Sequence, residues 1–266
     1  MQKNILFGQF IEQDSLIHRL DPRTKLLGMV LMMVSFFALR TWVDYAAATA
    51  FVLIVMGLSH ISIWMYLRTL KPVWFILVFT WTYNAILTPG TTILWSWSFI
   101  SLTAEGIETG TVVVWRIGLM ILLASILTLT TKPLALALGL EKLLSPLSRL
   151  HVSVEQISLM VVIAIRFIPT IMEELERIML AQKARGYDIT ALKLPKRLLA
   201  YIPIVVPLFM TTIQRAEQLS LAIDARAYGN GKGRSSYRVL RLTTTDFRAG
   251  GCTIGFIFVL LLLSGG

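Results

Sequence analysis

Long apolar runs, separated by short charged stretches, constrain the fold of this chain more than any other feature. Of its 266 residues, 56% are hydrophobic and only 15% are charged. A soluble globule of this length would carry more apolar surface than it could bury, whereas a bilayer accommodates helices of about 20 apolar residues. The composition therefore predicts an all-α membrane protein that crosses the bilayer several times.

Five of the apolar runs are long enough to span the bilayer. The first begins after Asp21, a good N-cap residue, with Pro22 at the first helical position. A polar loop with Glu105 and Glu108 precedes the fourth run. We therefore expect a polytopic protein with about five transmembrane helices. These cover approximately residues 21–40, 42–59, 72–87, 112–131 and 250–263.

The distribution of charge orients these spans. The formal net charge is +10, and Lys and Arg of membrane proteins gather in cytoplasmic loops, so this excess indicates such loops rather than a nucleic-acid surface. With the N-terminus inside, Arg23, Lys25 and Lys71 also lie inside, whereas Glu105 and Glu108 lie outside. Charges spread through the first 25 residues leave no apolar core for a cleavable signal peptide. We expect a multi-pass protein of the cell (plasma) membrane with a cytoplasmic N-terminus and an outer C-terminus.

Residues 132–248 form a basic block between the fourth and the last span. The block holds 17 of the 25 Lys and Arg residues, but also apolar segments that begin near Ile157 and Leu198. An outward crossing of the first segment would carry many of these cations outside, against the positive-inside rule. We therefore expect two or three amphipathic cytoplasmic helices, bent or broken by prolines, with the two long ones ending near Arg185 and Arg226. The chain would then divide into residues 1–131, 132–248 and 249–266.

The two long helices of the basic block end in nearly the same letters. AQKARGYD, residues 181–188, is similar to AIDARAYG, residues 222–229. A shift of forty-one residues aligns the two helices, which suggests two copies of one functional element. The identical pairs are Thr170 and Thr211, Glu176 and Glu217, Ala181 and Ala222, Ala184 and Ala225, Arg185 and Arg226, and Tyr187 and Tyr228.

Each helix end, called a tip below, has an arginine between two small residues. Small neighbours leave the guanidinium unshielded, and its five fixed donors suit a carboxylate-lined groove of another protein. Such an arginine also suits any helix end, where it complements the helix dipole and where Gly186 can close the helix in the left-handed region. Closure alone does not require the same alanine and tyrosine twice, so we predict that both tips bind a partner. The first tip is Ala184, Arg185 and Gly186, and the second is Ala225, Arg226 and Ala227.

The N-terminal segment carries a second pattern. DSLIHRLDPRTKL, residues 14–26, is similar to the motif Ser-x-x-His-x-Leu-Asp-Pro-Arg-x-Lys at the start of the first span in the transmembrane T component of energy-coupling-factor (ECF) transporters. Residues 129–147 resemble the short helix that precedes the coupling helices of this family, and residues 165–186 resemble its first coupling helix. The likeness extends over nearly the whole chain. Four matching residues, called the N-terminal motif below, are His18, Asp21, Pro22 and Arg23.

The resemblance implies a division of labour. A T component links two cytoplasmic ATPase subunits, identical or different, to a separate substrate-binding membrane subunit, the S component. Arg185 and Arg226 would each be seated in a groove of one ATPase. Closure of the ATPases on ATP would then move the two coupling helices, whose apolar faces would pass the motion to the S component.

Such transport would serve the uptake of vitamins or similar micronutrients. The two tips resemble those of the shared type of T component, which serves several S components. The sequence identifies neither the substrate nor the ATPase subunit that each arginine would contact. Ala227 stands where the family prefers glycine, so closure of the second helix is expected to shift to Gly229.

The sequence does not suggest catalysis by this chain. GNGKGRSS, residues 229–236, lacks the spacing of a phosphate-binding loop, so ATP hydrolysis is expected in partner subunits. The histidines His18, His60 and His151 stand in separate segments without the spacing of metal ligands. We expect no catalytic residue, no metal and no cofactor.

Three expectations concern single residues. Arg116 lies inside the fourth span, so we expect it to reach the interface or to pair with a glutamate of the outer loop. Glu173 and Arg177 stand four residues apart and should pair on the helix surface. Cys252 lies in an apolar run and is interpreted as a small buried hydrophobe.

Three other functions compete with the coupling function. A conventional permease would bind substrate itself and would need polar residues along its spans, which are nearly bare of them. An intramembrane enzyme would need a cluster of His, Asp or Cys near the interface. A scaffold that binds anionic lipid would average over many charges, whereas docking in a groove depends on one arginine.

Overall fold

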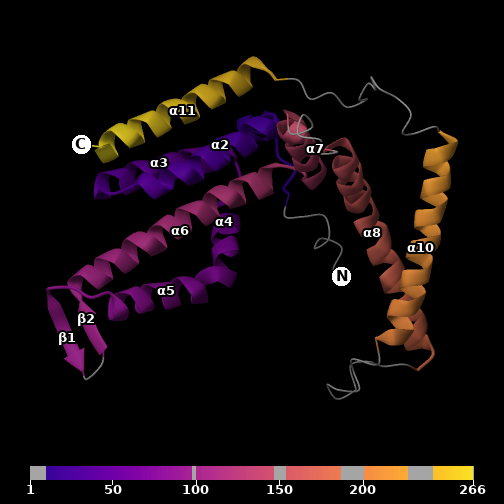
Figure 1. Cartoon of the computed structure of the whole chain (residues 1–266), viewed down its shortest axis with the longest axis horizontal. Helices are drawn as coiled ribbons and strands as arrows, with labels where there is room; N and C mark the ends of the chain where they lie inside the picture. The colour runs from indigo at the N-terminus through magenta and orange to yellow at the C-terminus, as the bar shows by residue number, and fades with distance from the viewer. Residues whose placement is uncertain (1–9, 98–99, 147–153, 187–200, 227–241, 266) are drawn as a thin grey trace. The chain divides into compact units, whose positions relative to one another are not determined.

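The computed structural model describes residues 10–97, 100–146, 154–186, 201–226 and 242–265 (Figure 1). The chain divides into two compact units, which are described separately. The membrane unit comprises residues 8–155 and 240–266, and the helix-pair unit comprises residues 1–7 and 156–239. The division into three parts expected from the sequence stays a prediction.

The membrane unit consists of helices and one small hairpin. The order of its elements is α1 (Leu16–Arg19), α2 (Pro22–Ser35), η1 (Phe36–Ala38), α3 (Trp42–Leu58), α4 (Ile63–Leu70), η2 (Lys71–Val73), α5 (Trp74–Leu87), β1 (Ile93–Trp97), β2 (Ile100–Thr103), α6 (Ala104–Thr130), α7 (Pro133–Leu144) and α11 (Thr244–Gly265).

Three helical segments of the described chain are long and apolar enough to cross a membrane: Ile63–Leu87, Ala104–Thr130 and Thr244–Ser264. A fourth apolar helix, Trp42–Leu58, is shorter. Many large apolar side chains are exposed on these helices. Such a surface suits a lipid bilayer, because the side chains then contact acyl chains instead of water. The expected all-α membrane class is confirmed. A crossing by α2 stays a prediction.

Two of the expected spans begin earlier than the sequence analysis placed them. The third is continuous from Ile63, and Pro72 stands in the short 3-10 turn η2 rather than at a helix start. The fourth begins at Ala104 because Thr103 caps it, its hydroxyl accepting the Gly106 N–H at 3.1 Å. Glu105 and Glu108 therefore belong to the first turns of α6 and not to a loop.

An antiparallel hairpin of β1 and β2 replaces the aromatic loop expected before the fourth span. Its register pairs Ile93 with Thr103 and Trp97 with Ile100. The Glu105 carboxylate accepts hydrogen bonds from the backbone N–H groups of Thr91 at 3.0 Å and Thr92 at 3.1 Å. The first turn of α6 thereby holds the start of the hairpin.

The core of the membrane unit lies where α2, α3, α6 and α11 meet. Close packing of α5 against α6 depends on glycine, because a Cβ at Gly106 would lie 2.8 Å from the Asn84 carbonyl oxygen. The core side chains include Met32, Phe36, Tyr45, Val52, Leu119, Leu123, Ile126 and Leu260.

The helix-pair unit contains α8 (Val154–Ala184) and α10 (Ile202–Ala225). Two contacts set their direction: the Gln182 side chain donates to the Pro203 carbonyl at 3.4 Å, and Arg215 lies 3.8 Å from Glu174. Residue numbers rise along one helix as they fall along the other, so the two helices are antiparallel (Figure 1).

Proline does not interrupt the two helices. Pro169 and Pro207 lie inside α8 and α10, which continue through them, and Pro203 stands in the first turn of α10. The prolines therefore do not break these helices, and a bend at them stays a prediction. A proline at the first turn costs no hydrogen bond, because that N–H has no partner within the helix.

Candidate functional site

The first tip closes α8 as the sequence predicted. Gly186 has a φ of +80°, in the left-handed region, and its N–H donates to the Lys183 carbonyl at 3.0 Å. The Arg185 N–H donates to the carbonyls of Ala181 and Gln182, at 3.2 and 3.1 Å. Ala184, Arg185 and Gly186 are all exposed. The backbone at the tip is thus satisfied locally, and the guanidinium is open to a partner.

The second tip ends α10 in a different way. Arg226 has a φ of −90°, and its N–H donates to the Ile223 carbonyl at 3.2 Å. Ala225 and Arg226 are exposed. Ala227, the expected closing residue Gly229 and both tyrosines of the repeat lie outside the described residues.

The antiparallel arrangement separates the two tips. The α8 contact nearest the first tip is made to the start of α10, so the second tip lies at the far end of the pair (Figure 1). The 24 residues of α10 rise about 36 Å at 1.5 Å per residue, which sets the scale of this separation. Neither Arg185 nor Arg226 forms an ion pair with another described residue. The repeat alone could not reveal this geometry, because a sequence shift carries no direction in space.

Glu174 joins the two helices of the pair. Its carboxylate lies 3.6 Å from the Arg177 guanidinium and 3.8 Å from that of Arg215, and its side chain is 18% exposed. The expected pairing of Glu173 with Arg177 is therefore wrong. The residue three positions before Arg177 reaches it, and the same carboxylate faces the neighbouring helix.

His18 of the N-terminal motif stabilises a local turn through both nitrogens of its ring. One ring nitrogen lies 2.7 Å from the Ser15 hydroxyl and the other lies 3.0 Å from the Ile11 carbonyl oxygen. Partial burial lowers the pKa of His18 below its ordinary value of 6.5, although the bond to Ile11 acts in the opposite direction. The neutral imidazole is therefore the form that this turn favours.

Asp21 connects two distant parts of the chain. Its carboxylate caps α2 by accepting the Arg23 N–H at 2.9 Å, with Pro22 at the first helical position as predicted. Its own backbone N–H donates to Asp246 at 2.7 Å. Asp246 also accepts the N–H and the hydroxyl of Thr243, at 2.8 and 2.6 Å, at the start of α11.

Lys25 completes the same junction from inside α2. Its ammonium donates to the carbonyls of His18 at 3.3 Å and Thr130 at 3.1 Å, and to the Thr131 hydroxyl at 3.1 Å. The carboxylates of Asp21 and Asp246 attract this charge. The N-terminal motif thus lies at a junction of α1, α2, the end of α6 and the start of α11.

The sequence analysis missed Asp246. It follows three threonines just before an apolar run, which is the pattern of a helix start with a side chain that reaches back to the capping residue. That signal could have identified the cap of α11. It could not have identified Asp21 as a partner, because the two residues are 225 positions apart.

Arg116 does not pair with a glutamate, and Cys252 is not buried. One terminal nitrogen of the Arg116 guanidinium donates to the Tyr45 hydroxyl at 2.7 Å and to the Leu39 carbonyl at 3.1 Å, whereas its Nε is buried without a hydrogen-bond partner. Cys252 is exposed on α11 and not buried. Within the ranges that the structure describes, no three His, Cys, Asp or Glu residues lie together as a metal site.

Comparison with known proteins places the chain in a family. A family profile described as "Cobalt transport protein" matches residues 13–237. The protein named energy-coupling factor transporter transmembrane protein EcfT in Ruminiclostridium cellulolyticum is 38% identical over 263 residues, which cover 99% of this chain and 98% of the relative.

Proteins of the same name occur among further relatives. The one from Brevibacillus brevis is 41% identical over 246 residues, covering 92% of this chain and 93% of its own. The one from Acidaminococcus fermentans is 36% identical over 266 residues, covering 100% and 99%. Identity at this level over whole chains shows that the protein belongs to the EcfT family of energy-coupling factor transporter transmembrane proteins.

Proposed function

We propose that this chain is the coupling subunit of an ATP-driven importer. It transmits conformational change in two cytoplasmic ATPase subunits, through α8 and α10, to a separate substrate-binding S component in the membrane. The transported substrates are vitamins or similar micronutrients, and ATP is hydrolysed by the partner subunits. The protein lies in the plasma membrane with its N-terminus and both tips in the cytoplasm.

The separated, exposed tips carry this proposal. Two arginines with small neighbours stand at opposite ends of one antiparallel pair, about 36 Å apart by the length of α10. One groove cannot accept both guanidinium groups over that distance. Two ATPase subunits, each with a carboxylate-lined groove, fit the spacing and the duplicated chemistry.

The length of the helices suits the transmission of movement. The Glu174 contact with Arg215 and the Gln182 contact with Pro203 hold the pair together, so a displacement of one tip moves both helices. Large apolar side chains of the pair, such as Met160, Phe209 and Met210, are exposed. In the proposed complex these faces contact the S component and lipid.

Retention of partner subunits tests the proposal. The chain is co-expressed with the candidate ATPases of its host, purified through a tag, and the ATPases that accompany it are quantified. We expect Arg185→Glu and Arg226→Glu each to weaken retention and the double variant to abolish it. Arg166→Glu is the matched control, because Arg166 is an exposed arginine of α8 far from the first tip and forms no ion pair with another described residue.

Conservative variants separate docking from general charge. Arg185→Lys and Arg226→Lys keep the charge but lose the planar fork, so they should retain less ATPase than wild type. Equal retention by wild type and the folded double charge-reversal variant would contradict the proposal. Loss of binding to anionic vesicles in proportion to total charge, without any effect specific to the tips, would favour the lipid scaffold.

A further inference from the structure

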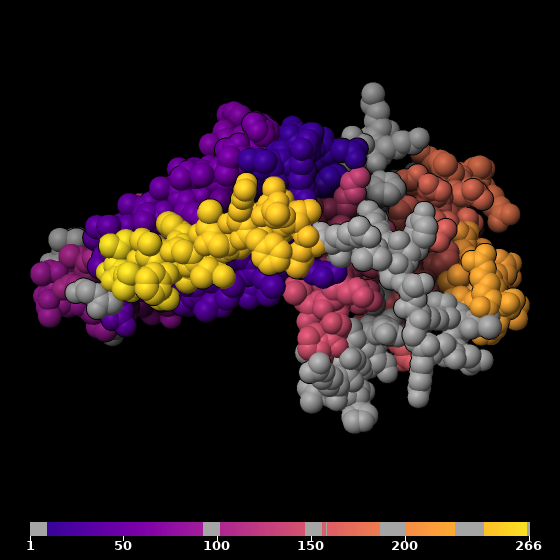
Figure 2. Space-filling model, turned by 90° about the horizontal axis from the view of Figure 1, so that it is seen from above, coloured from indigo at the N-terminus to yellow at the C-terminus, as the bar shows by residue number. Residues whose placement is uncertain are grey.

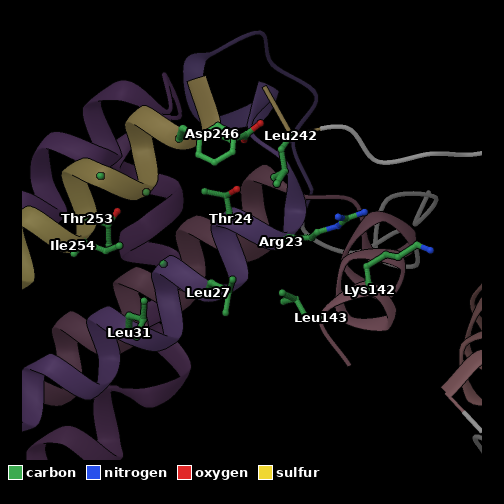
Figure 3. A pocket seen from close by; sticks show the side chains of 14 residues that line it. Arg23, Thr24, Leu27, Leu31, Lys142, Leu143, Leu242, Asp246, Thr253 and Ile254 are labelled. Atoms are coloured by element: carbon green, nitrogen blue, oxygen red, sulfur yellow. The ribbon is translucent and has the colours of Figure 1, made fainter. Parts of the chain in front are cut away.

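A groove opens on the membrane unit beside the N-terminal motif (Figure 3). Residues of α2, α7 and α11 line it, and its volume is about 500 Å³. Small-molecule sites have volumes of about 300–1,000 Å³, so the groove has the size of a real site. All of its lining residues belong to the membrane unit, whereas both tips belong to the helix-pair unit.

The two ends of the groove differ in polarity. Arg23 and Lys142 line one end, where the guanidinium of Arg23 points toward α7 (Figure 3). Leu27 and Leu31 follow Arg23 at four-residue spacing, so the α2 wall becomes apolar over about 12 Å along the helix axis. On the α11 side, Gly250, Gly251 and Ile254 continue this apolar wall.

The acidic residues near the cationic end are already engaged. Asp246 lines the groove but is 3% exposed, and both of its oxygens accept hydrogen bonds from Thr243 or Asp21. Asp21 is 7% exposed, caps α2 and lies 3.9 Å from Nε of Arg23, whose side chain is 22% exposed. Of the charged groups at this end, Lys142 is the most exposed to an incoming ligand, and Arg23 lies beside it.

The apolar side chains around the groove indicate that a ligand enters it from the bilayer. α11 lies along α2 (Figure 2), and both present exposed apolar side chains, including Leu27, Phe247 and Ile254. In a membrane protein such surfaces face acyl chains. A ligand that enters from this side is therefore amphipathic, with an anionic group at one end and a hydrocarbon chain at the other.

We propose that the groove binds one anionic phospholipid of the cytoplasmic leaflet. The phosphate lies at Arg23 and Lys142, and one acyl chain lies between α2 and α11. The bound lipid fills the space between the junction of the N-terminal motif and the bilayer. This site is independent of ATPase docking.

Lipid retention by the full-length chain tests the proposal. The purified protein in detergent is titrated with phosphatidylglycerol or phosphatidylcholine, and bound lipid is counted by native mass spectrometry. Glycerol phosphate and inorganic phosphate serve as probes of the head group alone. We expect phosphatidylglycerol to be retained about fivefold more strongly than phosphatidylcholine, the preference that about one basic residue at a membrane surface provides, and neither small anion to be retained.

Two pairs of variants make the test specific. Lys142→Gln should lower the retention of phosphatidylglycerol about fivefold, whereas Lys71→Gln, a basic residue outside the groove, should not. Gly251→Leu should block the acyl chain, whereas Gly255→Leu should not. Both glycines have open space at the Cβ position, so the two changes should have similar effects on folding. Only Gly251 lines the groove.

Three outcomes would overturn the proposal. The first is equal retention of the two lipids by wild type. The second is an equal loss in Lys142→Gln and Lys71→Gln, which would indicate general surface charge. The third is a Gly251→Leu variant that retains lipid as well as Gly255→Leu, which would leave the groove free for a protein segment.

Discussion

The N-terminal junction and the helix pair are built on opposite principles. At the junction, Asp21, Lys25 and Asp246 join four helices through mostly buried polar contacts. In the helix pair, each tip closes on its own last turn and leaves its arginine exposed. The junction is complete within the chain, whereas the tips await a partner subunit in the function that we propose. Stability should therefore depend on the first region and assembly on the second.

The largest effect on stability is expected at Lys25. Lys25→Met removes the donor for Thr130 and Thr131 and the ammonium that the carboxylates of Asp21 and Asp246 attract. A buried polar group without its partner costs about 1–3 kcal/mol, and more when charged, so we expect about 3 kcal/mol here. Thermal unfolding in detergent measures the loss, with Lys71→Met as control. Equal thermal midpoints for the two variants would show that the Lys25 contacts of the junction do not stabilise the protein.

A packing change in the same unit should have the next largest effect. In Gly106→Ala the new Cβ would lie 2.8 Å from the Asn84 carbonyl oxygen and 2.9 Å from that of Ala85, so α5 and α6 must separate. Overpacking of this kind costs about 1–3 kcal/mol. Gly118→Ala on the same helix meets nothing within 4 Å and should be neutral or stabilising. A Gly106→Ala protein as stable as Gly118→Ala would contradict the close packing.

A change at the first tip should act locally. Gly186→Ala places a side chain at a φ of +80°, which costs about 1 kcal/mol. We expect faster amide hydrogen exchange in the last turn of α8 and weaker retention of ATPases, with an unchanged midpoint for the membrane unit. Gly57→Ala, in a helix with open space at the Cβ, is the control. A lowered midpoint of global unfolding would contradict this prediction, because it would show that the first tip contributes to the stability of the membrane unit.

The smallest effect is expected from pH. Because the folded state lowers the pKa of His18 below 6.5, the unfolded chain binds the proton more readily. The stabilisation by His18 is therefore fully present above pH 6.5 and decreases as the pH falls from there toward the lowered pKa. Thermal midpoints measured between pH 8 and 5 should fall less in His18→Gln than in wild type. Parallel curves for the two proteins would assign the pH dependence to other groups.

Much of this protein could be predicted from the order of its residues. Apolar run length predicted a membrane protein because a bilayer demands helices that satisfy their own backbone. Capping by Asp21 with Pro22 and closure by Gly186 were predicted because both depend on residues a few positions apart. Wrong predictions, such as the glutamate partner of Arg116, concerned side chains with several candidates within reach.

Other features were decided by tertiary structure alone. The repeat defined two matched tips, but only the antiparallel contacts of α8 and α10 set them at opposite ends of the pair. Asp246 became a partner of Asp21, and Lys142 a neighbour of Arg23, through the packing of helices far apart in sequence. Helix capping depends on residues a few positions apart, so it can be predicted from the sequence. Contacts between residues far apart in the sequence depend on how the helices pack, which no short stretch of sequence encodes.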